Sequence, residues 1–242
     1  MAALHGLLFE VHTVDGRSID DTFLLNDVFL LPADPAVVQV AATEERSYVA
    51  GPGCRAVVWV AGCLRRCPGC SLREYQAFTS GRPVEVHDLA RQVLAIGGLD
   101  GVTYSGGEPF EQALPLAELS RILKRSGLTI VVYSGYTLSA LEGAPERFGS
   151  LLREADILID GEYREELSGA YRWRGSANQQ IHTLSQDRYD SSQWRDGIRE
   201  SQLAFGADGL RLTGFPSEDF EETLLAGLRR QGVVARRKSA AH

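Results

Sequence analysis

Three cysteines in one short loop constrain this chain more than any other feature of its sequence. Cys63, Cys67 and Cys70 follow a C-x3-C-x2-C spacing, so a single loop carries three thiols that can reach a common centre. A structural zinc ion normally takes four protein ligands, whereas a four-iron cluster can be held by three cysteines, which leaves one iron without a protein ligand. The spacing therefore predicts a metal site, and by itself it leaves zinc and an iron-sulfur cluster equally open.

Disulfides are a weaker interpretation of these cysteines. The fourth cysteine of the 242-residue chain, Cys54, lies in the same segment. A chain of this length buries a sufficient core without covalent bridges, and bridges between cysteines three or four residues apart would close small strained loops. We expect Cys54, in Gly-Pro-Gly-Cys-Arg, to be a small buried residue; as a fourth ligand it would close the open iron.

Composition and charge exclude several classes of protein. Hydrophobic residues make up 44% and charged residues 24% of the chain, as in ordinary globular proteins. The net charge of −7 argues against a surface for nucleic acid, which needs a concentrated basic stripe. No apolar run is long enough to span a bilayer, and no signal peptide is recognisable at the start. We therefore expect a cytoplasmic protein with no nucleic-acid or membrane partner.

Short apolar segments alternate with helical patterns along the middle of the chain. The patterns predict strands at residues 56–60, 102–104, 129–133 and 157–159, helices at residues 84–94 and 116–123, and helical material over residues 137–154. Strands that are apolar throughout and separated by helices indicate a parallel sheet with right-handed crossovers. The predicted fold class is α/β, with an open or partial (β/α) barrel. Residues 161–183 are expected to be irregular, and a late strand at 210–212 and a last helix near Ser217 complete the prediction.

Polar residues follow each of the four predicted strands. The cysteines follow the first, Gly106, Gly107 and Glu108 the second, Ser134 the third, and Asp160 the fourth. Carboxyl ends of parallel strands meet at one edge of the sheet, so the pattern predicts that these residues gather at one mouth.

The cysteine loop and Tyr-Ser-Gly-Gly-Glu-Pro at 104–109 together resemble the radical S-adenosylmethionine (SAM) superfamily. Within it, residues 51–70, 133–136 and 173–179 resemble the anaerobic ribonucleotide reductase activating proteins and their 4Fe-4S single cluster domain relatives. Gly69 stands where the wider superfamily often carries an aromatic residue, and Cys-Pro-Gly-Cys is the form of the activating-protein branch. The resemblance covers residues 51–183.

The resemblance implies a radical SAM partial barrel with a 4Fe-4S cluster on Cys63, Cys67 and Cys70, whose open iron chelates the amino and carboxylate groups of SAM. Reductive cleavage of SAM would give methionine and a 5′-deoxyadenosyl radical that abstracts hydrogen. Arg65 and Arg66, between the first two cysteines, are either positive neighbours of a negative cluster or solvated surface residues. No side chain is assigned a catalytic role.

The same resemblance places SAM beside the other strand ends. Gly106 and Gly107 would let the backbone approach the SAM amino group, Glu108 would receive its positive charge, and Ser134 and Asp160 would contact its carboxylate or ribose hydroxyls. Asn178, in Arg-Gly-Ser-Ala-Asn-Gln at 174–179, would line the SAM or substrate side. Helix caps and turns are alternatives for Ser134 and Asp160, and a loop that bonds to itself is the alternative for Asn178.

The predicted organisation is a β-rich extension over residues 1–50, the partial barrel over 51–235 and a tail over 236–242. We expect the extension to add edge strands to the main sheet, and a small cap or a partner surface is the alternative. The implied activity is hydrogen abstraction from a glycine of a large glycyl-radical enzyme, with electrons from a flavodoxin or ferredoxin. A tailoring enzyme for a peptide or small metabolite is the alternative. A zinc-stabilised or ferredoxin-like binding module is the alternative that is not an enzyme.

Overall fold

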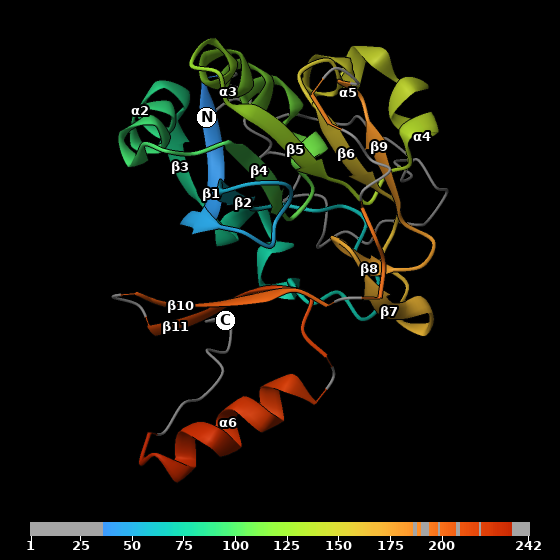
Figure 1. Ribbon diagram of the computed structural model, residues 1–242. Coiled ribbons are helices and arrows are strands. Elements are labelled where there is room, and N and C mark those ends of the chain that lie inside the picture. Colours follow the sequence, from blue (N-terminus) through green and yellow to red (C-terminus); the bar gives the residue numbers. More distant parts are fainter. Residues whose placement is uncertain are drawn as a thin grey trace, which may run out of the picture.

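A computed structural model describes residues 36–185, 188–189, 194–197, 199–206, 209–217 and 219–233. Within these residues the centre is a seven-stranded sheet with the order β3-β1-β2-β4-β5-β6-β9 (Figure 1). Four neighbouring strands run parallel: β2 (Arg55–Val60), β4 (Gly101–Gly106), β5 (Thr129–Tyr133) and β6 (Ile157–Asp160). The remaining strands pair antiparallel on either side: β1 (Val37–Ser47), β3 (Arg82–Glu85) and β9 (Gln180–Thr183).

Helices connect the parallel strands and cover one face of the sheet (Figure 1). They are α2 (Val86–Ile96), α3 (Ala113–Arg125), the short α4 (Leu138–Glu142) and α5 (Pro145–Leu152). The helical material expected over 137–154 is divided into two helices, because the chain turns at Gly143 and Ala144 and restarts at Pro145. Proline suits the first turn of a helix, where its missing N–H costs nothing.

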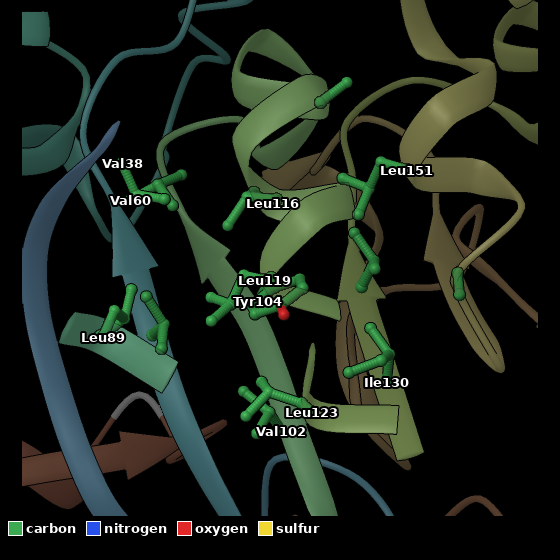
Figure 2. Packing of buried hydrophobic residues seen from close by; sticks show 14 of the residues in the cluster. Val38, Val60, Leu89, Val102, Tyr104, Leu116, Leu119, Leu123, Ile130 and Leu151 are labelled. Atoms are coloured by element: carbon green, nitrogen blue, oxygen red, sulfur yellow. The ribbon is translucent and has the colours of Figure 1, made fainter. Parts of the chain in front are cut away.

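The main core lies between the sheet and these helices (Figure 2). Alternate residues of the strands, such as Val60, Tyr104 and Ile130, are at most 2% exposed and pack against helix residues such as Leu116 and Leu119. The strand residues between them are also buried, in smaller clusters that include Val57 and Val131. Burial on both faces explains why these strands are apolar throughout.

The α/β class and the parallel core are therefore confirmed. The sheet itself is open, with β3 and β9 as its edges. Closure into a partial barrel stays a prediction.

Further strands lie in the second half of the chain. β7 (Ser168–Tyr171) and β8 (Arg174–Ser176) form one hairpin, and β10 (Ser201–Gly206) and β11 (Gly209–Gly214) form another. The irregular course expected for 161–183 is therefore wrong, since β7, β8 and β9 all fall within it. These strands have three or four residues each, too few for periodicity to reveal them. The last helix, α6, runs from Phe220 to Arg230.

The main sheet begins before residue 51. β1, within the predicted extension, joins the main sheet as expected, but it lies between β3 and β2 and is therefore not an edge strand. Residues 1–35 of the predicted extension and the tail at 236–242 lie outside the described residues. In the part of the chain that is described, no helix has both the length and the apolar character needed to cross a membrane.

Candidate iron-sulfur site

The cysteine loop and the Gly-Gly-Glu loop pack directly on each other at the carboxyl ends of β2 and β4. The N–H of Gly107 donates to the Val60 carbonyl at 2.7 Å, and the N–H of Glu108 donates to the Gly62 carbonyl at 2.7 Å. A Cβ added at Gly107 would lie 2.3 Å from the Gly62 carbonyl oxygen. A glycine is therefore required at 107 for the two backbones to approach this closely.

The four cysteines fall into two groups. Cys63, Cys67 and Cys70 are free and half-buried in the loop after β2, whereas Cys54 is buried just before β2 begins. The six residues of β2 separate the groups by about 20 Å at 3.3 Å per residue. Cys54 is therefore a core residue, as expected, and its sulfur lies 3.8 Å from an Arg46 nitrogen.

The thiols of the loop sit among both donors and acceptors. The Cys63 sulfur accepts backbone N–H groups of Arg65 and Arg66, but burial is the larger effect and raises the pKa of this thiol to about 12. Burial, together with a hydrogen bond to Glu162, raises the pKa of Cys67 to about 11. Without a bound cation these thiols hold their protons, and a metal is the kind of partner that would displace them.

Among the described residues, no three His, Cys, Asp or Glu side chains are gathered as metal ligands. The chemistry of the loop nevertheless fits an iron-sulfur cluster. Three thiols come from one loop, backbone N–H groups point at one of the sulfurs, and the Nε of Arg65 is buried without an acceptor. Hydrogen bonds to sulfur are a common means of tuning such clusters.

Glu108 is turned into the protein. Its carboxylate is 1% exposed and accepts the Ser134 hydroxyl at 3.0 Å and the N–H groups of Phe110 and Gly135 at 3.1 and 2.8 Å. Burial raises the pKa of Glu108 to about 7, and these hydrogen bonds oppose the shift. The carboxylate thus ties the loop after β4 to the loop after β5, a structural task that the sequence did not suggest. Its predicted contact with the SAM amino group stays a prediction.

Ser134 and Asp160 take different places at this edge. Ser134 joins Glu108 and also accepts the N–H of Tyr136 at 3.0 Å. Asp160 accepts the N–H of Leu138 and lies 3.1 Å from the Nε2 of His182. The structure therefore brings Ser134 to Glu108, and gives Asp160 a role at the start of α4. The predicted contacts of Ser134 and Asp160 with SAM stay predictions.

Asn178 lies in a loop that bonds largely to itself. Its amide nitrogen donates to the Glu162 carbonyl at 2.7 Å, and the neighbouring Gln179 side chain accepts the N–H groups of Gly175 and Ser176. The Oδ1 of Asn178 is buried without a partner among the described residues. This acceptor is free for a ligand, and the loop reaches the site through Glu162, whose side chain contacts Cys67.

Known proteins match this chain over the segment that contains the site. A family model described as "4Fe-4S single cluster domain" matches residues 49–182. The anaerobic ribonucleoside-triphosphate reductase-activating protein of Salmonella typhi is 35% identical over 145 residues, which cover 56% of this chain and 92% of that protein. The proteins of that name from Escherichia coli K12 and phage T4 are each 31% identical, with 56% and 55% of this chain and 92% and 86% of those proteins covered.

The structure of QueE from Escherichia coli shares 13% identity over 58% of this chain and 77% of that chain, and its TM-score of 0.37 is too low to inform the fold. The family match is more informative. It contains the three cysteines, Gly-Gly-Glu and the strand ends that follow, and it leaves out β10, β11 and α6. The resemblance drawn from the sequence is thereby confirmed: this chain belongs to the 4Fe-4S single cluster domain family, together with the anaerobic ribonucleoside-triphosphate reductase-activating proteins.

Proposed function

We propose that this chain is a radical SAM enzyme of the activating-protein type, with Cys63, Cys67 and Cys70 as the cluster ligands. The observation that carries the proposal is the arrangement of the two loops. Cys63, Cys67 and Cys70 lie on the loop at the carboxyl end of β2. The backbone of this loop packs directly on the backbone of the Gly-Gly-Glu loop. The relatives that share this segment are covered over 92% of their length.

When bound, the cluster supplies the electron that cleaves SAM to methionine and a 5′-deoxyadenosyl radical. The residues of this chain would bind SAM and orient it beside the cluster. Gly106 and Gly107 keep side chains out of the space between the loops, and Glu108 fixes the loop after β5 through Ser134 and Gly135. Asn178 offers an unpartnered acceptor and Asp160 a carboxylate, and we propose both as polar contacts for SAM.

We further propose that the substrate is a glycine residue of a large partner enzyme. Relatives of this chain are named activating proteins of anaerobic ribonucleoside-triphosphate reductase. By the resemblance to such proteins, the partner would receive a glycyl radical, and a flavodoxin or ferredoxin would supply electrons. Reduced thiols and an oxygen-sensitive cluster favour a cytoplasmic location.

A tailoring reaction on a peptide or small metabolite is the second candidate. The β10–β11 hairpin lies beyond the family match and docks on β1 and β2: Gln202 donates to Glu44 of β1 at 2.7 Å, and Arg211 lies 5.5 Å from the ring centre of Trp59 in β2. An addition fixed this firmly beside the shared segment would change what the enzyme admits, which favours a substrate other than the reductase.

Anaerobic reconstitution with iron and sulfide tests the common part of both candidates. After reduction with dithionite and addition of SAM, the protein is expected to release 5′-deoxyadenosine. Cys63→Ser, Cys67→Ser and Cys70→Ser should each abolish the cluster absorption and the product, whereas Cys54→Ala is the matched control that should retain both. Bound zinc with no cluster absorption would overturn the proposal.

The partner decides between the two candidates. If the chain is an activating protein, a glycyl-radical signal in electron paramagnetic resonance (EPR) should appear only when the chain, SAM and a glycyl-radical enzyme are combined under reduction. Release of 5′-deoxyadenosine without that signal, together with turnover of a peptide or metabolite, would favour the tailoring reaction.

A further inference from the structure

Arg65 crosses from the cysteine loop to the neighbouring loops of the site. Its guanidinium carbon lies 4.8 Å from the ring centre of Tyr136, in the loop after β5. A guanidinium nitrogen lies 3.5 Å from the carboxylate of Glu162, in the loop after β6. Arg65 therefore contacts residues 71 and 97 positions further along the chain and is not a solvated surface residue, one of the two interpretations that the sequence left open.

The absence of a side chain at Gly135 makes room for the Arg65 side chain. A Cβ added at Gly135 would lie 2.6 Å from the Cδ of Arg65 and 2.7 Å from its Nε. The ring beneath the guanidinium is itself fixed, because the Tyr136 hydroxyl donates to Glu111 at 2.7 Å and Arg147 pairs with the same carboxylate at 2.5 Å. The Glu111 side chain is 1% exposed, so the support for the ring is buried. Arg65 thus lies in a defined place and not free in solvent.

The opposite charges of Arg65 and Glu162 both act on the Cys67 sulfur. The Cys67 thiol is hydrogen-bonded to Glu162, and the charge of Arg65 acts on the same sulfur in the opposite sense. The Arg65 side chain is 25% exposed and that of Glu162 30%, so water screens the pair only in part. The Nε of Arg65 is also buried without an acceptor among the described residues. A fixed cation with an unused donor therefore lies beside a proposed ligand.

We propose that Arg65 is a positioning residue that holds the cysteine loop against the loops after β5 and β6 and raises the reduction potential of the cluster. The inference rests on the proposed function, because it needs the cluster on Cys63, Cys67 and Cys70. Reduction adds one negative charge to the cluster, and a nearby fixed positive charge stabilises that state. Glu162 opposes this effect and fixes the direction of the guanidinium.

A redox titration of the reconstituted protein, followed by EPR, tests the proposal. Arg65→Gln should lower the ratio of reduced to oxidised cluster at a set potential by about tenfold, which is about 59 mV for one electron. Arg65→Lys, which keeps the charge, should recover most of the difference. Arg73→Gln is the matched control, since this exposed arginine lies three residues after Cys70, and it should leave the ratio unchanged.

Two further variants keep the test decisive if Arg65→Gln does not retain iron. Glu162→Gln removes the opposing charge and should shift the ratio by a similar factor in the opposite direction. Gly135→Ala pushes the guanidinium aside without straining the backbone and should shift the ratio in the same direction as Arg65→Gln, by less. Equal potentials for Arg65→Gln and Arg73→Gln, for Arg65→Gln and Arg65→Lys, or for Glu162→Gln and the unmodified protein would each overturn the inference.

The titration separates this inference from the proposed function. If the unmodified protein forms no cluster, the proposed function fails. If it forms a cluster and releases 5′-deoxyadenosine while the variants leave the potential unchanged, the proposed function stands and the role of Arg65 fails.

Discussion

The stability of the fold can be tested at Arg55, a fully buried arginine at the start of β2. It is 0% exposed, and all five of its N–H groups find acceptors. The acceptors are the hydroxyls of Thr103 and Thr129 and the carbonyls of Pro52, Val102 and Thr129, at 2.7 to 3.1 Å. The guanidinium thus joins the amino-terminal halves of three adjacent parallel strands, β2, β4 and β5, to the loop before β2. Burial lowers the pKa of Arg55.

Arg55→Met removes these hydrogen bonds while filling a similar volume. Four of the five acceptors belong to buried residues, but the hydroxyls of Thr103 and Thr129 keep hydrogen bonds to Ala50 and Asp100. The loss therefore falls mainly on the carbonyls of Val102 and Thr129, and each unsatisfied group costs about 1–3 kcal/mol. The variant no longer has to bury a charge, which offsets part of that loss. We expect a net destabilisation of about 3 kcal/mol, which lowers the melting temperature by about 6–12 °C for a domain of this size.

Thermal and urea unfolding of the iron-free protein, followed by circular dichroism, measures this change. Arg91→Met is the matched control, because the Arg91 side chain is 78% exposed and its substitution should change stability by no more than about 0.5 kcal/mol. If Arg55→Met unfolds within about 1 kcal/mol of the unmodified protein, the hydrogen bonds of Arg55 do not stabilise the sheet and the reasoning is refuted.

Three other expectations concern the site. Gly107→Ala should cost at least about 2 kcal/mol in urea unfolding and impair cluster assembly, since backbone blocks the new Cβ, whereas Gly227→Ala in α6 should be neutral or stabilising. Burial raises the pKa of Glu108 from 4.5 to about 7. The protonated side chain therefore contributes its full stabilisation below pH 4.5, and this contribution is lost as the pH rises through 7. Relative to Glu108→Gln, the free energy of unfolding of the iron-free protein should fall by about 3 kcal/mol by pH 8. Chelation of iron should leave the far-ultraviolet circular dichroism unchanged, because the main core contains no cysteine.

Each of these results has a clear opposite. Equal stability of the Gly107 and Gly227 variants would show that the two loops can move apart at little cost. A difference between Glu108→Gln and the unmodified protein that does not vary with pH would show that the carboxylate ionises in the folded protein as it does in water. Loss of secondary structure on chelation would show that the cluster and the fold are linked.

The sequence by itself determined the parallel core and the position of each motif at a strand end. β5 was predicted at its observed bounds, Thr129–Tyr133, and β6 and α2 within two residues of theirs. Periodicity and apolar runs are local properties, so they can be read without knowing what lies opposite. The spacing of Cys63, Cys67 and Cys70 is equally local, and it separated these three from Cys54.

Only the tertiary structure decided which partners the polar side chains take. Glu108 lies 26 positions from Ser134, Arg65 lies 97 from Glu162, and β9 pairs with β6 although its four residues show no period. Such contacts depend on strand order, register and the paths of loops, none of which a local pattern encodes. The sequence therefore supplied the ligands and the loops, and the fold made Glu108 a buried link and brought Arg65 and Glu162 to Cys67.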